Sequence, residues 1–312
     1  MSASDPFHHV RDAEYFELPR GIHLPTPRIP LPDFLGGELV VSKFMILQVV
    51  AVAIIFFIFT GLARRVRSGE PVKGRFWNFW EAIALFVRDQ VVRPTIGDHS
   101  HDDHHGHGDH GHGDHGGHGH DAKHGHGEHH GGGDYHHPAD KYLPFIWSCF
   151  FYVLICNLLG AVPFLGSATG NLNVTGALAL TAFLATVIFG FNAMGPAGFF
   201  GNMMPDTGVP GLFGRGLTLG IFAIEVLGFF IKHGVLAVRL FANIMGGHTV
   251  LGVILGFIAL GADQGFLWGP ITLGSIGMQI FIGCLELFVA FLQAYVFSFL
   301  ATIFIAGAIH KH

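Results

Sequence analysis

The sequence predicts an all-α polytopic membrane protein with about five membrane-embedded helices. Half of its 312 residues are hydrophobic and only 12% are charged, whereas a soluble domain carries about 25% charged residues. The apolar residues gather into long runs, and the first of them, residues 44–63, contains no charge. Twenty helical residues span about 30 Å, the thickness of the hydrocarbon core of a bilayer. Two runs near the end of the chain are far longer and carry ionisable residues.

Composition divides the chain into four parts. Residues 1–40 form a polar, proline-rich segment that we expect to be irregular, and residues 41–95 hold the first span and a following helix. Residues 96–140 form a histidine-rich loop, and residues 141–312 form a helical core. Basic residues cluster directly after the first span, which predicts that this end faces the cytoplasm (or matrix) and that the N-terminus lies on the non-cytoplasmic side. The cluster consists of Arg64, Arg65, Arg67, Lys73 and Arg75.

The segment after this cluster, residues 75–94, predicts one interfacial amphipathic helix. At helical spacing its aromatic and aliphatic side chains share one face, which we expect to lie on the membrane surface. A helix buried in the protein core is the alternative. The apolar face holds Phe76, Phe79, Trp80, Ile83 and Val87, and the polar face holds Asn78, Glu81, Arg88 and Asp89.

Residues 99–137 are of low complexity and hold 16 of the 23 histidines of the chain. So much glycine and so little apolar surface predict a disordered loop. Imidazole and carboxylate groups bind zinc, nickel and copper, so we expect weak, incidental metal binding by such pairs as His104 and His105 or His129 and His130. No dedicated metal site and no cofactor are expected.

Two ordinary spans are predicted at residues 143–165 and 174–195, and two abnormal ones follow at residues 217–261 and 271–308. Asn157 is the one strong polar group of the first ordinary span, and a helix–helix hydrogen bond is expected for it. Each abnormal run is either broken into two spans or forms one steeply tilted helix. No proline lies inside either run, so we expect two long tilted helices that form a hairpin turning at residues 262–270.

Ionisable residues of the first long helix form a stripe. Glu225, Lys232 and Arg239 are spaced by seven residues, so successive side chains differ by about 20° around the helix. Asn243 continues the stripe, whereas His248 points about 180° away from Arg239. An arginine at the centre of a span is unfavourable by about 2.5–3.5 kcal/mol, which indicates that Arg239 is functional.

The other polar residues of the two long helices leave structural alternatives open. Glu225 and Lys232 also fit an ion pair near a helix end, and His233 fits a side chain that snorkels to the interface. On the second long helix, Glu286 and Gln293 are again seven residues apart and share a face. Gln293 also fits a hydrogen bond between helices.

At these residues the sequence resembles a known family. The segments VRLFANIMGGHTV and LELFVAFLQAYVFSFL closely resemble the membrane-embedded subunit a of F-type ATP synthases. NLLGAVP and GNLNVTGALAL resemble the middle helices of that family. The resemblance covers about residues 35–95 and 141–308, and the histidine-rich loop departs from the family pattern.

The resemblance implies a proton-conducting stator subunit of the Fo sector, with no catalytic residue of its own. Arg239 matches the family's essential arginine, which faces the rotating c-subunit ring. Asn243 and Gln293 match its polar neighbours, while Glu225, His248 and Glu286 fall where the family places ionisable groups of two aqueous half-channels. The implied partners are the c-ring, the peripheral-stalk b subunits, the remaining ATP synthase subunits and membrane lipid, without nucleic acid. An energy-coupling membrane, the bacterial inner membrane, is the expected location.

A secondary metal-ion transporter with a histidine-rich cytoplasmic loop is the competing class. Such a protein needs histidine and aspartate ligands within its spans. No aspartate lies in any apolar run, and His233 and His248 are poorly placed on one helix to share an ion. The sequence therefore favours the stator subunit over the transporter.

Overall fold

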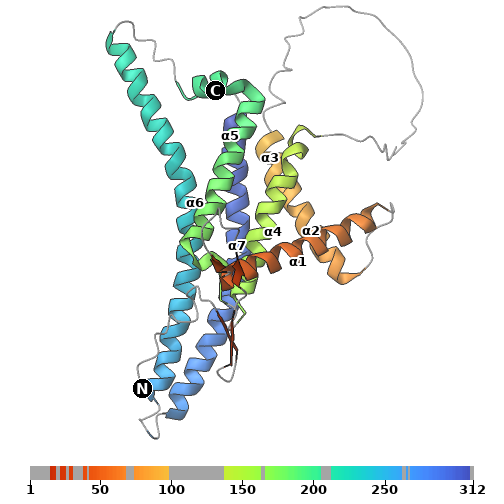
Figure 1. Cartoon of the computed structure of the whole chain (residues 1–312), viewed down its shortest axis with the longest axis vertical. Helices are drawn as coiled ribbons and strands as arrows, with labels where there is room; N and C mark the ends of the chain where they lie inside the picture. The colour runs from red at the N-terminus through yellow and green to blue at the C-terminus, as the bar shows by residue number, and fades with distance from the viewer. Residues whose placement is uncertain are drawn as a thin grey trace, which may run out of the picture.

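The computed structural model describes residues 15–18, 22–25, 28–30, 38–40, 42–67, 74–97, 137–162, 166–204, 212–261, 265 and 268–309. Within these residues, five helices are long and apolar enough to cross a membrane. They are α1 (Lys43–Val66), α4 (Leu143–Gly160) with its preceding 3-10 turn, α5 (Leu172–Asn202), α6 (Leu212–Gly261) and α7 (Trp268–Ile309). The predicted helical polytopic fold is therefore confirmed (Figure 1).

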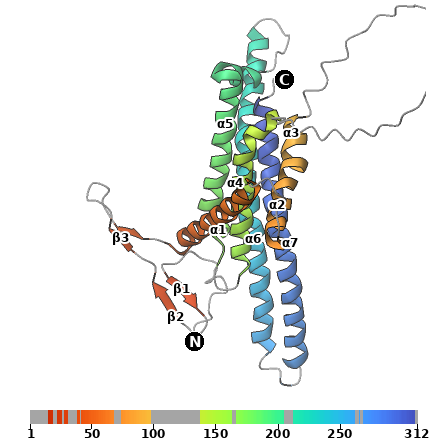
Figure 2. The same ribbon diagram turned by 90° about the vertical axis from the view of Figure 1, so that its right-hand side faces the viewer.

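The N-terminal segment was predicted to be irregular, and this was wrong for four short stretches. β1 (Tyr15–Leu18) pairs antiparallel with β2 (Ile22–Pro25), and β3 (Arg28–Pro30) pairs antiparallel with β4 (Glu38–Val40). The two ladders lie beside the start of α1 (Figure 2). Strands of three or four residues leave too little alternating pattern to stand out in a polar sequence.

Ser42 directly precedes α1, and its hydroxyl accepts a hydrogen bond from the amide of Met45 and so caps the first turn. It crosses the direction of the other long helices (Figure 1). At its far end it meets α2 (Arg75–Val87) through Gly61, where a Cβ atom would lie only 2.2 Å from the ring of Trp77. Glycine is therefore required at this corner, because any side chain would displace the indole.

Helix α2 continues through a π-helical turn (Arg88–Val92) into α3 (Arg93–Gly97). The prediction that its apolar face lies on the membrane surface was wrong for most of that face. Trp80, Ile83 and Val87 are buried in the protein core, and Trp80 packs against Phe151 of α4. Only Phe76 and Phe79 of the predicted face stay exposed. The alternative of a core-packed helix therefore holds for the greater part of α2.

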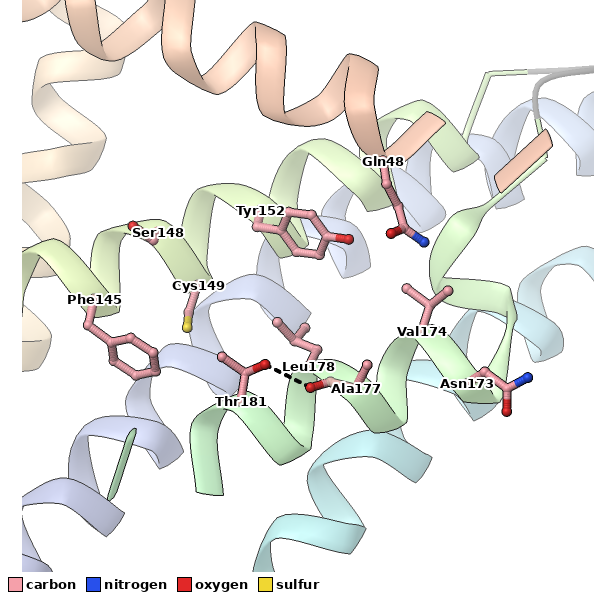
Figure 3. A pocket seen from close by; sticks show the side chains of 10 residues that line it. All are labelled: Gln48, Phe145, Ser148, Cys149, Tyr152, Asn173, Val174, Ala177, Leu178 and Thr181. Carbon is pink, nitrogen blue, oxygen red and sulfur yellow. Dashed lines mark hydrogen bonds between the residues drawn. The ribbon is translucent and has the colours of Figure 1, made fainter. Parts of the chain in front are cut away.

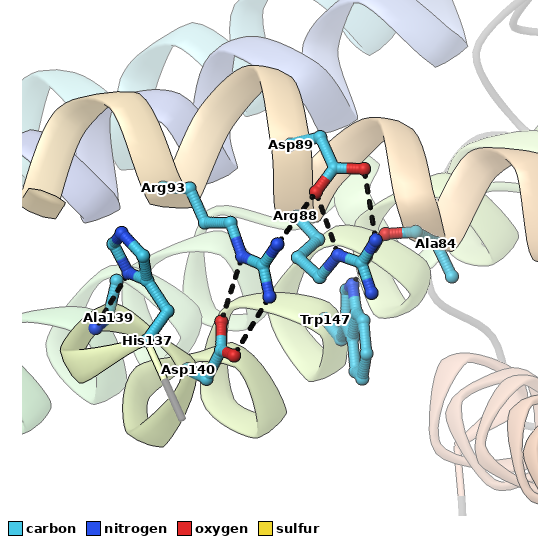
Figure 4. Close-up of polar contacts among 8 residues, drawn as sticks. All are labelled: Ala84, Arg88, Asp89, Arg93, His137, Ala139, Asp140 and Trp147. Atoms are coloured by element: carbon cyan, nitrogen blue, oxygen red, sulfur yellow. Dashed lines mark hydrogen bonds and ion pairs between the residues drawn. The ribbon is translucent and has the colours of Figure 1, made fainter. Parts of the chain in front are cut away.

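Charged side chains join α3 to the 3-10 turn η4 (Pro138–Tyr142) that leads into α4 (Figure 4). The Arg93 guanidinium donates two hydrogen bonds to the Asp140 carboxylate, at 3.2 and 3.0 Å. Arg88 donates two more to Asp89, and this hydrogen bonding lowers the pKa of the Asp89 carboxyl below its usual range. The ion pair of Arg93 with Asp140 brings the two ends of the histidine-rich segment together, and His137 lies against Gly97.

His137 is the one histidine of the histidine-rich segment inside the described residues, and its ring nitrogen Nδ1 accepts a hydrogen bond from the amide of Ala139. The predicted disorder and the weak metal pairs His104, His105, His129 and His130 lie outside the described residues. A group of three or more His, Cys, Asp or Glu side chains that could hold a metal ion is not found in the described part of the chain.

Helix α4 forms the centre of the molecule and packs against α1, α5's preceding turn and α7. Most of its side chains are buried, among them Phe150, Phe151 and Val153. α5 bends at Gly195, whose φ of 74° is followed by Pro196, so its last residues turn away from the helix axis. The returning Phe199 packs against Gly190, where a Cβ atom would lie 2.6 Å from the phenylalanine ring.

The last two helices form the predicted hairpin, which turns between Gly261 and Trp268 (Figures 1 and 2). α6 has 50 residues and α7 has 42, and α6 passes through Gly234, Gly246 and Gly247 without a break. At 1.5 Å per residue they are about 75 and 63 Å long, roughly twice the hydrocarbon thickness. Unbroken helices of this length fit inside a bilayer only at a steep tilt.

Candidate functional site

Arg239 lies on the outer surface of the α6–α7 hairpin. The residues around it on this side of α6 are exposed and apolar, including Val235, Val238 and Ala242. Exposed aromatic and aliphatic side chains such as Phe281 and Phe288 likewise occupy the outer surface of α7. A guanidinium set in such a surface needs a partner of opposite charge, because lipid cannot solvate it.

The pairing of the two helices fixes which residues lie at the same level. The Glu286 carboxylate lies against Gly247, with its Oε1 atom 3.0 Å from the position of a Cβ there. Counting along the antiparallel hairpin from this contact brings Arg239 level with Ala294, next to Gln293. Asn243 comes level with Ala290 by the same count. Gln293 therefore lies near the level of Arg239, and Asn243 lies about one helical turn from it; both side chains are half-buried.

His248 and Glu286 are brought to one level of the hairpin, because Gly247 directly precedes His248. The Nε2 atom of His248 is buried and has no hydrogen-bond partner among the described residues. No direct bond links the imidazole to the Glu286 carboxylate in the described part of the chain. A buried ring nitrogen without a hydrogen-bond partner is energetically unfavourable, which makes His248 a candidate for a functional residue.

Glu225 and Lys232 lie on α6 toward its first residue and form a loose ion pair, with 3.9 Å between Lys232 Nζ and Glu225 Oε1. Both border a cavity of about 280 Å³ between α6, the bent end of α5 and the last turns of α7. The cavity lining includes Asn202, Phe304 and Gly307. A carboxylate, an ammonium and an amide at one cavity provide the polar groups that water needs to enter.

A second cavity of about 810 Å³ opens between α6 and α7 near their turn and ends at Thr249, next to His248. Its walls are mainly aliphatic, with Thr249 and Ser275 as hydroxyl-bearing members. Arg239 lies between the two cavities, about 21 Å of helix from Glu225 and about 15 Å from Thr249. The two spaces are thus separated along the hairpin by the level of Arg239.

The alternative that His233 snorkels to the interface does not hold. Its side chain is 4% exposed and is enclosed by the rings of Phe183, Phe229 and Phe304, which come from α5, α6 and α7. Its Nδ1 atom lies 2.9 Å from the backbone oxygen of Phe229. His233 therefore belongs to the packing between three helices and not to the Arg239 stripe.

Asn157 makes a polar contact that the sequence did not reveal. Its side-chain oxygen accepts a hydrogen bond of 2.8 Å from Thr169, and the Thr169 hydroxyl contacts Ser167 at the same distance. The expected helix–helix hydrogen bond is replaced by this bond to the 3-10 turn η5 (Ala168–Gly170), which itself contacts α6. The only sequence signal was the cluster of small hydroxyl and amide residues after α4.

A third cavity, of about 530 Å³, lies between α1, α4 and α5 (Figure 3). Gln48 of α1 and Tyr152 of α4 extend into it, and Asn173 and Thr181 of α5 border it. None of the residues predicted for the proton path lines this cavity. It is therefore separate from the charged hairpin.

Comparison with known proteins decides between the two function classes. A family model described as ATP synthase A chain matches residues 132–306, a region that includes α6 and all but the last three residues of α7. The chain belongs to the ATP synthase subunit a family. This membership makes it a non-catalytic, proton-translocating membrane subunit, which confirms the coarse prediction from the sequence and argues against the metal transporter.

Individual relatives extend the match beyond the family model. ATP synthase subunit a of Chloroherpeton thalassium is 30% identical over 310 residues, covering 98% of this chain and 76% of that protein. Subunit a 2 of Chlorobium luteolum is 31% identical over 305 residues, covering 96% of this chain and 74% of that protein. Subunit a of Anaeromyxobacter dehalogenans is 35% identical over 247 residues, but this chain covers only 52% of it.

Proposed function

We propose that the chain is the proton-conducting stator subunit of the Fo sector of ATP synthase. In this proposal, Arg239 is the charge that couples proton flow to rotation of a c-subunit ring. The observation that carries the proposal is the position of Arg239: one exposed guanidinium on an apolar outer surface, between two cavities that open at opposite ends of the hairpin. Such a surface could contact a membrane-embedded ring whose carboxylates pass the guanidinium one after another.

The guanidinium favours the ionised form of a carboxylate that passes it. Arginine stays protonated at every accessible pH, so it presents a permanent positive charge. A c-ring carboxylate is neutral while it faces lipid, because an unpaired charge there is costly. It must lose its proton before it reaches Arg239 and regain one before it re-enters lipid. Proton transfer on the two sides of Arg239 therefore drives the ring in one direction.

Protons reach the ring through two half-channels in this proposal. The cavity at Glu225 and Lys232 serves the cytoplasmic side, and the level of His248 and Glu286, reached from the cavity at the hairpin turn, serves the opposite side. The positive charge of Arg239 repels a proton moving directly from one side to the other. Asn243 and Gln293, near its level, support the guanidinium through hydrogen bonding.

The orientation of the chain follows from the basic end of α1. Arg64, Arg65 and Arg67 favour the cytoplasmic side, so the N-terminus lies on the opposite side of the membrane, which we take to be the bacterial inner membrane. The c-ring, the peripheral-stalk b subunits and the remaining ATP synthase subunits are the proposed partners. The exposed surfaces of α1 and α6, where only 17% of the most apolar 18-residue stretch is buried, leave room for these subunits and for lipid.

Disulfide cross-linking tests the c-ring assignment. Single cysteines at Val235 or Ala242, which flank Arg239 on the exposed surface, should form adducts with a cysteine placed next to the c-subunit carboxylate. The buried Ala237, two residues from Arg239, is the matched control and should form none. Cys149, Cys156 and Cys284 are first replaced by alanine. Adducts at Ala237 alone, or at none of the three positions in an assembled complex, would contradict the proposal.

A further inference from the structure

The corner between α1 and α2 carries a group of guanidinium ions with no role in the proton path. Residues 64–75 hold five basic residues and one acidic residue, Glu70. Arg64, Arg67 and Arg75 are exposed, and within the described residues none of them pairs with a carboxylate. All three lie within about two helical turns of the contact between Gly61 and Trp77.

A fourth arginine joins the two helices at this corner. The Arg65 guanidinium lies 4.0 Å from the centre of the Trp77 ring and donates a hydrogen bond of 3.1 Å to the backbone oxygen of Gly61. Phe57 contacts the same indole, with ring centroids 6.0 Å apart. A cation over an aromatic face is attracted to it, so Arg65 stabilises the junction of the two helices. The other three arginines extend from the two helices that this contact joins.

Apolar side chains continue directly from these charges. On α1, Arg64, Phe57 and Val50 are spaced by seven residues and form one stripe, in which Phe57 is 62% exposed. On α2, Phe76 and Phe79 are exposed next to Arg75, and Phe79 is 57% exposed. The corner thus presents positive charge at one level and bare apolar surface immediately beside it.

We propose that this corner, formed by Arg64, Arg67, Arg75, Phe57, Phe76 and Phe79, is a binding site for anionic phospholipid. The phosphate group would contact the three guanidinium ions, and an acyl chain would lie along the stripe of Phe57 and Val50. Because α1 is a membrane span that ends at these arginines, they lie at the depth of headgroups. Clustered basic residues at the cytoplasmic end of a span attract anionic lipid, and arginine matches phosphate with paired donors. The site does not depend on the proposed coupling role of Arg239.

An acidic segment of a partner protein is the other ligand that three arginines could bind. The apolar stripe favours lipid, because an acidic peptide would not contact Phe57 and Val50 on the hydrocarbon-facing part of α1. Phosphatidylglycerol and phosphatidylcholine of equal chain length separate the contribution of charge from that of the acyl chain. The two lipids are therefore the probes of choice.

The test is lipid binding by the full chain, purified in its assembly in a mild detergent and titrated with each lipid. We expect phosphatidylglycerol to bind more tightly than phosphatidylcholine. The triple variant R64Q/R67Q/R75Q should weaken phosphatidylglycerol binding by about a hundredfold, since each basic residue near the surface contributes about fivefold. Binding of phosphatidylcholine should be unchanged.

Two further variants control this experiment. Arg215→Gln removes another exposed arginine, on α6, and should leave both affinities unchanged. The charge-conserving variant R64K/R67K/R75K should retain most of the phosphatidylglycerol affinity, which excludes a folding defect as the cause of the loss. Equal binding of the two lipids by the unaltered chain would overturn the proposal. An unchanged phosphatidylglycerol affinity in the glutamine variant would also overturn it. A third contradicting result is displacement of bound lipid by a soluble acidic peptide at a concentration much lower than the concentration of phosphatidylglycerol needed for binding.

Discussion

Arg239→Ala should abolish proton-driven ATP synthesis while the complex still assembles. The arginine is exposed on α6, so its removal leaves no cavity in the core and should not lower the amount of chain in the membrane. An ion pair of guanidinium and carboxylate at about 4 Å is worth about 4 kcal/mol at an effective dielectric constant of 20. Without it, the ionised c-ring carboxylate is too rare to pass the stator, and we expect synthesis to fall about a hundredfold or more.

Arg239→Lys should restore little of this activity, since a desolvated lysine loses its proton readily and lacks the planar arrangement of donors. Arg215→Ala, another exposed arginine near the start of α6, is the matched control and should keep synthesis near the wild-type rate. The rate is measured in inverted membrane vesicles energised by respiration and normalised to the amount of complex. Substantial synthesis by Arg239→Ala vesicles would remove Arg239 from the coupling step.

His248→Ala and Glu286→Ala should each lower proton uptake strongly, and exchanging the two residues should recover part of it. The structure brings both side chains to one level of the hairpin, where the Glu286 carboxylate lies against Gly247. The buried Nε2 atom of His248 has no partner among the described residues, which favours a relay over a static salt bridge. Imidazole gains and loses protons near neutral pH, so an imidazole and a carboxylate at one level can pass a proton between them.

The exchange variant, H248E/E286H, separates chemistry from position. A relay needs an imidazole and a carboxylate at this level but not in a fixed order, whereas truncation to alanine removes one of them. Cys284→Ala, an exposed neighbour of Glu286 on the same helix, is the control and should behave as wild type. Proton flux is followed with a pH-sensitive dye in vesicles. Normal flux in both single alanine variants would show that this level takes no part in conduction.

The helices themselves could be predicted from the sequence, because a bilayer imposes length and composition on every span. The uncharged run at residues 44–63 became α1 (Lys43–Val66), and the two overlong runs became the unbroken helices of the hairpin. The spacing of seven between Glu225, Lys232 and Arg239 also carries directly into the structure, since helical periodicity is a local property. An antiparallel hairpin that turns at residues 262–270 places His248 and Glu286 at about the same distance from the turn, so their common level could also be predicted.

Features that depend on distant parts of the chain could not be predicted. His233 is buried because Phe183 and Phe304 reach it from two other helices, and nothing near position 233 encodes that enclosure. The apolar face of α2 looks the same in sequence whether it meets lipid or protein, and Trp80 turned out to pack on Phe151. The partner of Asn157 is Thr169, in a 3-10 turn too short to show a pattern.

Thiol labelling from each side of the membrane tests whether two water-filled cavities are separated by the level of Arg239. Single cysteines replace Met203 in the cavity with Glu225, Thr249 in the cavity at the turn, or the buried Leu236 near Arg239. A charged, impermeant maleimide reacts with a cysteine only where water reaches the side chain, because the thiol ionises there and the thiolate is the reactive form. We expect labelling of Met203→Cys from the cytoplasmic side only, of Thr249→Cys from the opposite side only, and of Leu236→Cys from neither. Labelling of Met203→Cys and Thr249→Cys from the same side, or of Leu236→Cys from both sides, would contradict this separation.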